Sequence, residues 1–203
     1  PRHRDVCQDG TDRDRGGIRL PCEWGRGGCC AGSTAKRAWR ELVGLLPFQG
    51  MTAPLRVVSL GLGPIGLAAA KLLLGKSTVQ LVGAVDSDPE LVGKDVGDLA
   101  ELASPAGILV EADAETVIAR LRPDAVLHCT SSFLPAIKDQ LLICVKHGAN
   151  VVSSAEELLV PAHQHPEIAA ELDAAAIAGG ASILGTGVNP GFAMDFLCAI
   201  ASA

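Results

Sequence analysis

Short apolar runs alternate along most of the chain with longer segments in which apolar residues recur every three or four positions. The short runs are typical of buried strands, and the longer segments are typical of amphipathic helices. Strands are predicted at residues 55–60, 80–85, 107–110, 125–129, 150–153 and 182–185. Helices are predicted at 64–75, 112–121, 166–178 and from 192 onward, and another has its apolar face at Leu134, Ile137, Leu141 and Val145. This alternation favours an α/β fold with a doubly wound parallel sheet.

A glycine-rich turn joins the first predicted strand to the first predicted helix. Its sequence is Gly61-Leu62-Gly63-Pro64-Ile65-Gly66. Gly61 lets the chain turn tightly off the strand, Gly63 lets the backbone approach a pyrophosphate, and Gly66 lets the helix pack close to the sheet. The free N–H groups and the positive dipole end of the helix would then face the phosphates. Pro64 suits this first helical turn, where its missing N–H costs nothing.

The second predicted strand ends in Asp86, twenty residues after Gly66. An acid at about this distance meets the adenosine ribose hydroxyls in dinucleotide-binding folds. The turn alone is weak evidence, because a glycine-rich strand-to-helix turn can be purely structural. With the strand, the helix and the acid in place, the pattern predicts a Rossmann-type NAD(P) site. Asp86 would repel a 2′-phosphate, which favours NAD, but Ser87 could donate a hydrogen bond to that phosphate and leaves NADP open.

Small hydroxyl residues follow two later strands. Thr130, Ser131 and Ser132 follow the fourth predicted strand, and Ser154 follows the fifth. Ligands of a doubly wound sheet lie beyond the carboxyl ends of its strands, so these side chains could contact the cofactor or the substrate. The alternative is ordinary helix capping, for which Ser and Thr are favoured. For Thr130 we favour contact with the cofactor.

Composition and charge limit the classes of partner. The 203 residues are 48% hydrophobic and 20% charged, which suits one globular domain or slightly more, with a substantial core. The net charge of −6 argues against a nucleic-acid partner. No apolar run is long enough to span a bilayer, and no secretory signal is evident, so a cytoplasmic location is expected.

The first fifty residues differ from the rest. They hold nine Lys and Arg against six Asp and Glu, whereas residues 51–203 hold eight against seventeen. They lack a sustained apolar period and contain four of the seven cysteines. A zinc-binding arm is disfavoured, because the cysteines lack paired spacing. A nucleic-acid-binding arm is disfavoured, because residues 51–203 have a charge balance of −9. The alternatives are a disordered extension and, favoured here, a translated upstream segment with Met51 as the true start.

Several reactive side chains receive a structural interpretation. His128 is inside a predicted strand and is expected in the core or at its rim. His163 and His165 flank a proline-bounded turn, and without a third ligand we expect them to be exposed rather than to bind a metal. Cys129 and Cys144 are expected to be buried thiols rather than nucleophiles or a disulfide. No metal site is predicted.

Two further segments carry a family resemblance. They are Asn150-Val151-Val152-Ser153-Ser154-Ala155-Glu156-Glu157-Leu158 and Gly185-Thr186-Gly187-Val188-Asn189-Pro190-Gly191-Phe192-Ala193-Met194-Asp195. With the glycine turn and the segment 85–89, they resemble the dihydrodipicolinate reductase-like dehydrogenases. Within that group, the chain is most similar to the 2,4-diaminopentanoate dehydrogenase branch of the NAD(P)-dependent amine dehydrogenases. The resemblance covers residues 54–195.

The resemblance implies a Rossmann domain over 51–190 and the start of a substrate domain at 191–203. It places Thr130, Ser131 and Ser132 along the nicotinamide ribose and Asn189 where the chain leaves the cofactor domain. It implies hydride transfer between nicotinamide and a C–N centre of a small amino-acid-like substrate. The proton-transfer residues and any homo-oligomer contacts are expected from a further domain, so no catalytic residue is named. The alternatives are a dihydrodipicolinate reductase of lysine biosynthesis and a non-catalytic NAD(P)-binding module.

Overall fold

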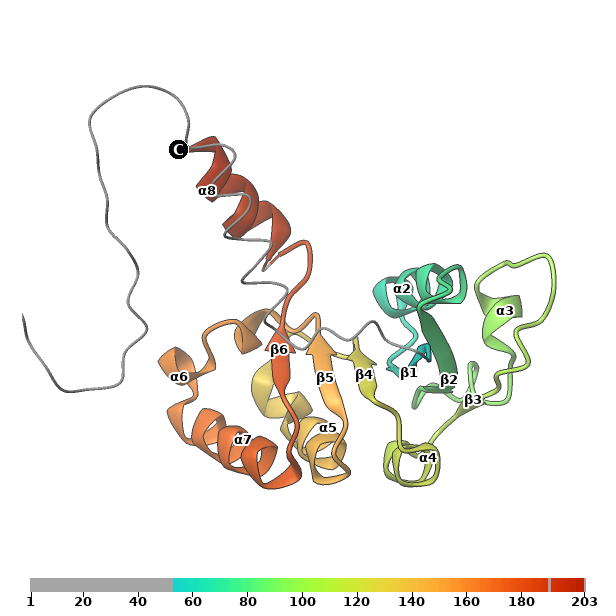
Figure 1. The fold of residues 1–203 in the computed structure, drawn as a ribbon, viewed down its shortest axis with the longest axis horizontal. Coiled ribbons are helices and arrows are strands. Elements are labelled where there is room, and N and C mark those ends of the chain that lie inside the picture. Colours follow the sequence, from blue (N-terminus) through green and yellow to red (C-terminus); the bar gives the residue numbers. More distant parts are fainter. Residues whose placement is uncertain (1–52, 190, 203) are drawn as a thin grey trace, which may run out of the picture. The chain divides into compact units, whose positions relative to one another are not determined.

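A computed structural model of the protein describes residues 53–189 and 191–202. The expectations for residues 1–50 and for a start at Met51 lie outside the described residues. Six parallel strands form one sheet in the order β3-β2-β1-β4-β5-β6 (Figure 1). This is the strand order of the doubly wound dinucleotide-binding fold, so the predicted fold class is confirmed.

The elements follow one another in strict alternation over most of the described chain. The strands are β1 (Leu55–Leu60), β2 (Val79–Val85), β3 (Val110–Glu111), β4 (Ala125–His128), β5 (Asn150–Ser153) and β6 (Ile183–Gly185). The helices are α2 (Pro64–Leu74), α3 (Val96–Leu99), α4 (Ala114–Leu121), α5 (Leu134–Lys146), α6 (Pro161–Gln164), α7 (Pro166–Gly179) and α8 (Leu197–Ala201). A 3₁₀ turn, η1 (Glu156–Leu158), follows β5, and a π-helical segment, η2 (Phe192–Phe196), precedes α8.

The third strand is the one placed wrongly by the sequence pattern, which puts it at 107–110. Gly107 has a left-handed φ of +73°, and the Ile108 N–H donates to the Asp95 carboxylate instead of to a neighbouring parallel strand. Leu109 forms an isolated antiparallel bridge with Asp95. Because these residues are held in a loop around Asp95, the parallel pairing with β2 begins only at Val110.

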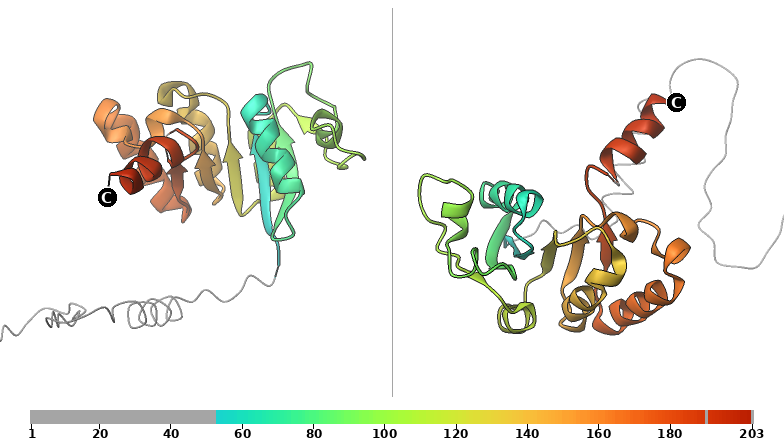
Figure 2. Two further views of the ribbon diagram at one scale, coloured as in Figure 1. Left: turned by 90° about the horizontal axis from the view of Figure 1, so that it is seen from above. Right: turned by 180° about the vertical axis from the view of Figure 1, so that it is seen from behind.

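Helices cover both faces of the sheet (Figures 1 and 2). The larger apolar core lies under α4, α5 and α7, and the smaller one lies under α2 and α3. The predicted apolar face of α5 is confirmed, since all four of its residues are buried: Leu134, Ile137, Leu141 and Val145. Among the described residues, no helix combines the length and apolarity needed to cross a membrane.

The strand order places the site. The central strand β1 pairs with β2 on one side and with β4 on the other. The chain passes from β3 at one edge of the sheet to β4 at its centre, so the loops after β1 and β4 leave in different directions. In a doubly wound sheet this switch point opens a crevice beyond the carboxyl ends of the strands.

Candidate functional site

The glycine turn lies at the carboxyl end of β1. Gly61 has a φ of +89°, and a Cβ on it would lie 2.6 Å from the carbonyl oxygen of Cys129, which directly follows β4. A Cβ on Gly66 would collide with the Gly61 carbonyl oxygen. A Cβ on Gly63 would meet nothing within 4 Å. Two of the glycines are therefore required by the fold itself, whereas Gly63 faces open space.

Helix α2 begins in this turn without a side-chain cap from the described residues. Its first intrahelical bond runs from the Leu67 N–H to the Gly63 carbonyl, at 2.8 Å. Pro64 occupies the first turn, and this turn contains no acidic residue. An uncapped helix N-terminus beside an open glycine is suited to a phosphate group, because it offers N–H donors and a positive dipole end.

Asp86 holds the other side of the turn. One carboxylate oxygen accepts the Leu62 N–H at 2.6 Å, and the other accepts the Asp88 N–H at 2.9 Å. A carboxylate offers about four lone-pair positions, so both oxygens could still accept hydrogen bonds from a ribose. Asp86 thus joins the glycine turn to the loop after β2 and keeps capacity for a ligand.

A cavity of about 310 Å³ opens between these elements. Its volume is at the lower end of the range for small-molecule sites. It is lined by Leu60, Gly61, Gly63, Val85, Asp86, Ser87, Ala112, Ala114, Cys129, Thr130 and Gln140. Five of the residues predicted from the sequence meet here: Gly61, Gly63, Asp86, Ser87 and Thr130.

The other predicted contact residues do not line this cavity. The Leu62 side chain is buried in the smaller core, so the backbone N–H is what Leu62 contributes beside Asp86. Pro64 and Ile65 are exposed on the first turn of α2, and Gly66 is buried there against the Gly61 carbonyl. The remaining residues stand beyond β4, β5 and β6, half-buried or exposed: Ser131, Ser132, Ser154 and Asn189. Their contact with a cofactor remains a prediction.

A buried network stands behind the β4 side of the cavity. His128 is fully buried, as predicted, and its Nδ1 lies 2.9 Å from Ser153 Oγ. Its Nε2 lies 2.8 Å from Gln140 Oε1 and 3.0 Å from Thr130 Oγ1. Burial lowers the pKa of His128 below its ordinary value of 6.5, although the hydrogen bond to Gln140 acts in the opposite direction.

Gln140 is a residue of the site for which the sequence pattern gives little sign. It lies on α5 and lines the cavity, and its Oε1 accepts the Thr130 hydroxyl at 2.7 Å. The available signal is that Gln140 is the uncharged member of the three polar residues between the buried Ile137 and Leu141 on α5. Such a position is more often solvated, so periodicity alone does not single it out.

Glu157 links the segments that follow β4 and β5 through hydrogen bonds. One oxygen of Glu157 accepts the Leu134 N–H at the start of α5, at 2.7 Å. The same oxygen lies 3.1 Å from His165 Nε2. The expectation that His165 is exposed is therefore wrong, because this contact holds it half-buried. His163 is exposed, as predicted.

The two thiols of the core region differ in their environment. Cys144 is fully buried, and burial raises the pKa of its thiol to about 12. Cys129 is half-buried and lines the cavity. Both are free thiols. The expectation of a buried thiol is confirmed for Cys144 and is wrong for Cys129, because Cys129 lies at the edge of the cavity. A thiol with so high a pKa is not a nucleophile near neutral pH, so Cys144 is a packing residue.

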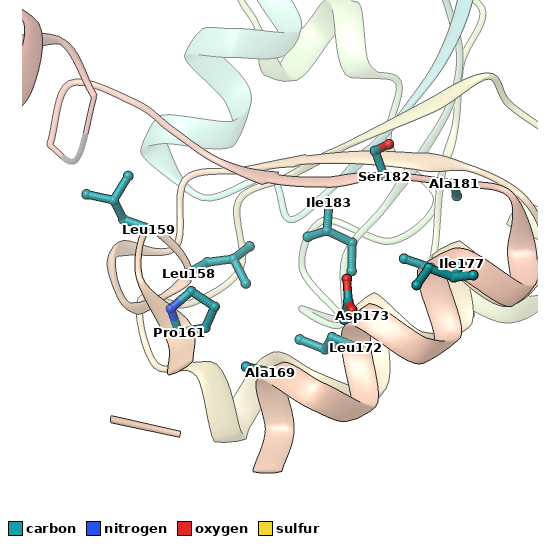
Figure 3. A pocket seen from close by; sticks show the side chains of 11 residues that line it. Leu158, Leu159, Pro161, Ala169, Leu172, Asp173, Ile177, Ala181, Ser182 and Ile183 are labelled. Atoms are coloured by element: carbon teal, nitrogen blue, oxygen red, sulfur yellow. The ribbon is translucent and has the colours of Figure 1, made fainter. Parts of the chain in front are cut away.

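The described chain has larger hollows elsewhere. One of about 510 Å³ lies between η1, α6, α7 and β6 (Figure 3). Its lining is mostly aliphatic, and Asp173 and Ser182 supply the polar side chains. It shares no lining residue with the cavity at the glycine turn. Size therefore does not identify the site, whereas the convergence of glycines, a helix N-terminus and a carboxylate does.

Together, the fold and this cavity define a dinucleotide-binding domain of the Rossmann type. The family model described as "Dihydrodipicolinate reductase, N-terminus" matches residues 55–157. The chain belongs to this family, and the predicted resemblance is confirmed.

Two curated relatives and one solved structure are similar to the chain at 34–41% identity. The chain is 40% identical over 146 residues to 2,4-diaminopentanoate dehydrogenase of Acetoanaerobium sticklandii, a match that covers 70% of this chain and 40% of the relative. It is 34% identical over 144 residues to an amine dehydrogenase of Streptomyces virginiae, covering 68% of this chain and 39% of the relative. The structure of amine dehydrogenase from Mycobacterium smegmatis matches with 41% identity and a TM-score of 0.63, covering 66% of this chain and 39% of that one. The chain thus spans about 40% of the length of these relatives.

Proposed function

We propose that the protein is an NAD(P)-dependent oxidoreductase that acts on the amine-bearing carbon of a small amino-acid-like substrate. The observation that carries this proposal is the cavity in which Gly61, Gly63 and Asp86 meet beside the uncapped start of α2. The names of the relatives supply the substrate class, since two curated relatives and one solved structure are amine or diamine dehydrogenases. They favour this activity over the reductase of lysine biosynthesis and over a non-catalytic module.

The proposal assigns each part of the dinucleotide to residues at this cavity. The N–H groups at the start of α2 would face the pyrophosphate, and Gly63 leaves room for its approach. Asp86 would accept hydrogen bonds from the adenosine ribose, and Ser87 lies beside it on the cavity wall. Thr130 and Gln140 would border the path toward the nicotinamide on the β4 side. The contacts of Ser131, Ser132, Ser154 and Asn189 with that half of the cofactor belong to the same proposal.

The overall chemistry is an oxidative deamination. When bound, the cofactor supplies the hydride acceptor. The amine carbon loses a hydride and its nitrogen loses a proton, and water converts the resulting imine into a ketone with release of ammonia. A general base must take up the proton, and we assign that role to no residue of this chain. The part of the work that falls to the described residues is to hold and orient the dinucleotide.

We further propose that the cofactor is NAD rather than NADP. The Asp86 carboxylate is fixed by two backbone N–H groups, so it cannot easily swing away from an added 2′-phosphate. The Asp86 carboxylate and a neighbouring 2′-phosphate would repel each other, because both are negatively charged. A tenfold preference for NADH over NADPH requires a difference of only about 1.4 kcal/mol in binding free energy. Ser87 alone would not offset a fixed negative charge.

The test is a titration of the full chain with NADH and with NADPH, followed by nicotinamide fluorescence. Wild type should bind NADH more tightly by at least about tenfold. Asp86→Asn removes the charge and keeps one oxygen for the Leu62 N–H, while the Asp88 N–H loses its acceptor. It should narrow the preference for NADH and keep the hydrogen bond to the glycine turn. A folded sample that binds neither nucleotide would overturn the dinucleotide proposal, and a preference for NADPH would overturn the choice of NAD.

Two further properties accompany the proposal. A cytoplasmic location agrees with the free thiols of Cys129, Cys144 and Cys198, because disulfides are rare in reducing compartments. Assembly into a homo-oligomer is also proposed, and light scattering of the purified chain measures it directly.

A further inference from the structure

The imidazole of His128 is the largest polar group buried in the sheet. It is 0% exposed and lies on β4, the strand that contributes Val126 to the larger core together with the apolar face of α5. A polar ring in such a place is costly unless its nitrogens are hydrogen-bonded. Both nitrogens have partners, and those partners come from three different elements: β5, α5 and the loop after β4.

The partners define the protonation state of the ring. Ser153 Oγ accepts the Ala155 N–H at 3.1 Å, so its own hydrogen is free for Nδ1 of His128. Gln140 Oε1 can accept both the Thr130 hydroxyl and an Nε2–H. We therefore assign the proton to Nε2 from the hydrogen-bond partners. If the Gln140 amide is turned over, the tautomer changes but the ring stays neutral, since its side-chain partners carry no charge.

The network reaches the cavity through Thr130. The Thr130 hydroxyl donates to Gln140 and lies 3.0 Å from His128 Nε2, which fixes its rotamer. In that rotamer its methyl group abuts Gly61, where an added Cβ would lie 2.8 Å from it. Thr130 and Gln140 both line the cavity, so two polar side chains of its β4 wall are held from behind by one buried ring.

We propose that His128 is a positioning residue of the dinucleotide site: it holds Thr130 and Gln140 in the arrangement that receives the cofactor. The inference rests on the proposed function, because it assumes that the cavity binds a nicotinamide dinucleotide. His128 itself is sealed from the cavity by burial and acts through the two side chains that it contacts.

Three substitutions separate the two ends of the ring. His128→Gln can place an amide near the position of Nε2 and keep the contact with Thr130 and Gln140. His128→Asn can place an amide only near Nδ1, where it reaches Ser153 and leaves the cavity side without a partner. His128→Leu removes both ends. NADH titration of the full chain should show an affinity loss of about tenfold for His128→Leu and His128→Asn, and within about threefold of wild type for His128→Gln.

A control variant separates positioning from general destabilisation. Val126→Ala truncates a buried side chain on the same strand without touching the network. It should lower the melting temperature and leave the Kd for NADH unchanged. If the Kd instead follows the melting temperature across Val126→Ala and the His128 variants, the role of His128 is only structural and the inference is wrong.

A double substitution tests the route through Thr130. Thr130→Val keeps the shape of the side chain and removes the hydroxyl. If His128 acts through this group, His128→Leu should weaken NADH binding in wild type but add little in the Thr130→Val background. Equal losses in both backgrounds would exclude this route. If His128→Leu does not fold, His128→Asn replaces it in this comparison, and the contrast between the Gln and Asn variants does not depend on His128→Leu.

The wild-type titration distinguishes the two proposals. Failure of the folded wild-type chain to bind NADH or NADPH overturns the proposed function. Wild-type binding that His128→Leu and His128→Asn leave within twofold overturns only the role of His128.

Discussion

The two walls of the cavity are built by different means. The wall formed by β1 and β2 is made of backbone: Gly61 and Gly66 exclude side chains, and Asp86 accepts two N–H groups. The wall on the β4 side depends on the side chains of Thr130 and Gln140, which His128 contacts from behind. One wall depends on the absence of atoms and on a charged carboxylate. The other depends on a set of neutral hydrogen-bond partners.

This difference separates the residues that the fold requires from those that mainly affect ligand binding. A side chain added to the backbone wall meets main-chain atoms, which cannot move without moving a strand. A change in the side-chain wall first alters rotamers, because its partners are hydroxyl, amide and imidazole groups. We therefore expect substitutions on the first wall to act on stability as well as binding, and conservative substitutions on the second to act mainly on binding.

The largest effect is expected for Gly66→Ala. Its Cβ would collide with the Gly61 carbonyl oxygen, so α2 must shift away from the turn. Overpacking of this kind costs about 1–3 kcal/mol, and the shift should also abolish NADH binding. Urea unfolding measures the first effect and fluorescence titration the second.

Gly63→Ala is the matched control for this variant. Gly63 has a φ of −60°, which alanine adopts freely, and nothing lies within 4 Å of its added Cβ. Its stability should stay within about 0.5 kcal/mol of wild type, while NADH binding weakens because the methyl group occupies the approach of the pyrophosphate. Equal destabilisation by both alanines would contradict the division into fold-required and ligand-facing glycines.

The backbone wall is also the wall that the sequence predicts. Gly61, Gly63 and Gly66 are close together in the chain, and each has a steric task that no other residue performs as well. Asp86 is recognised because a strand and a helix fix its distance from the turn. Most of the fold follows in the same way, from local periodicity and from the right-handed connection of parallel strands.

Apart from Thr130, the side-chain wall is hidden from such reasoning. His128 and Gln140 are twelve residues apart, on a strand and a helix, and only the docking of α5 on the sheet brings them together. Ser153 joins them through the register of β4 and β5, which pairs His128 with Ser153. The third strand is misplaced for a related reason, since the carboxylate of Asp95 competes for the N–H of Ile108. Long-range partners of this kind leave no periodic pattern in the chain.

Glu157→Ala should have the next largest effect on stability, at the contact between η1 and the start of α5. It removes the acceptor of the Leu134 N–H at the positive end of α5 and also the partner of His165. A hydrogen bond of this kind contributes about 1 kcal/mol. Urea unfolding should show that loss, and Glu157→Gln should recover at least half of it because its amide oxygen can still accept. A Gln variant as unstable as the Ala variant would show that charge, rather than the hydrogen bond, is what matters.

A fall in pH should destabilise the protein through His128 before it affects Asp95, with no effect at neutral pH. Burial lowers the pKa of His128 below 6.5, so the unfolded chain binds its proton first. The stability contributed by the neutral ring is complete above about pH 6.5 and declines as the pH falls from there toward the lower folded pKa. His128→Gln should remove this slope, and urea midpoints between pH 8 and pH 5 measure it relative to wild type.

Asp95 should act in a lower window. Burial would raise the pKa of its carboxyl, but hydrogen bonds from the Ala106, Gly97 and Ile108 N–H groups outweigh it, and the pKa falls below 3.8. Its contribution is present above about pH 3.8 and is lost as the pH falls through the folded pKa. Asp95→Asn should flatten the curve there and leave the His128 window unchanged. A single acid transition that both variants shift alike would contradict the independence of the His128 and Asp95 hydrogen-bond networks.

The smallest effect is expected for Lys138→Met, which lies outside both walls. Lys138 Nζ lies 3.1 Å from Glu171, so the pair links α5 to α7 at the surface, where half of the Glu171 side chain is exposed. Exposed pairs of this kind contribute about 0.2–1 kcal/mol and are screened by salt. Methionine keeps most of the aliphatic stem, so urea unfolding should show a loss within about 0.5 kcal/mol, and the loss should shrink in high salt. NADH affinity should not change. A loss of stability as large as that of Glu157→Ala would contradict this order. It would mean that the surface contact between α5 and α7 matters as much as the hydrogen bonds of Glu157.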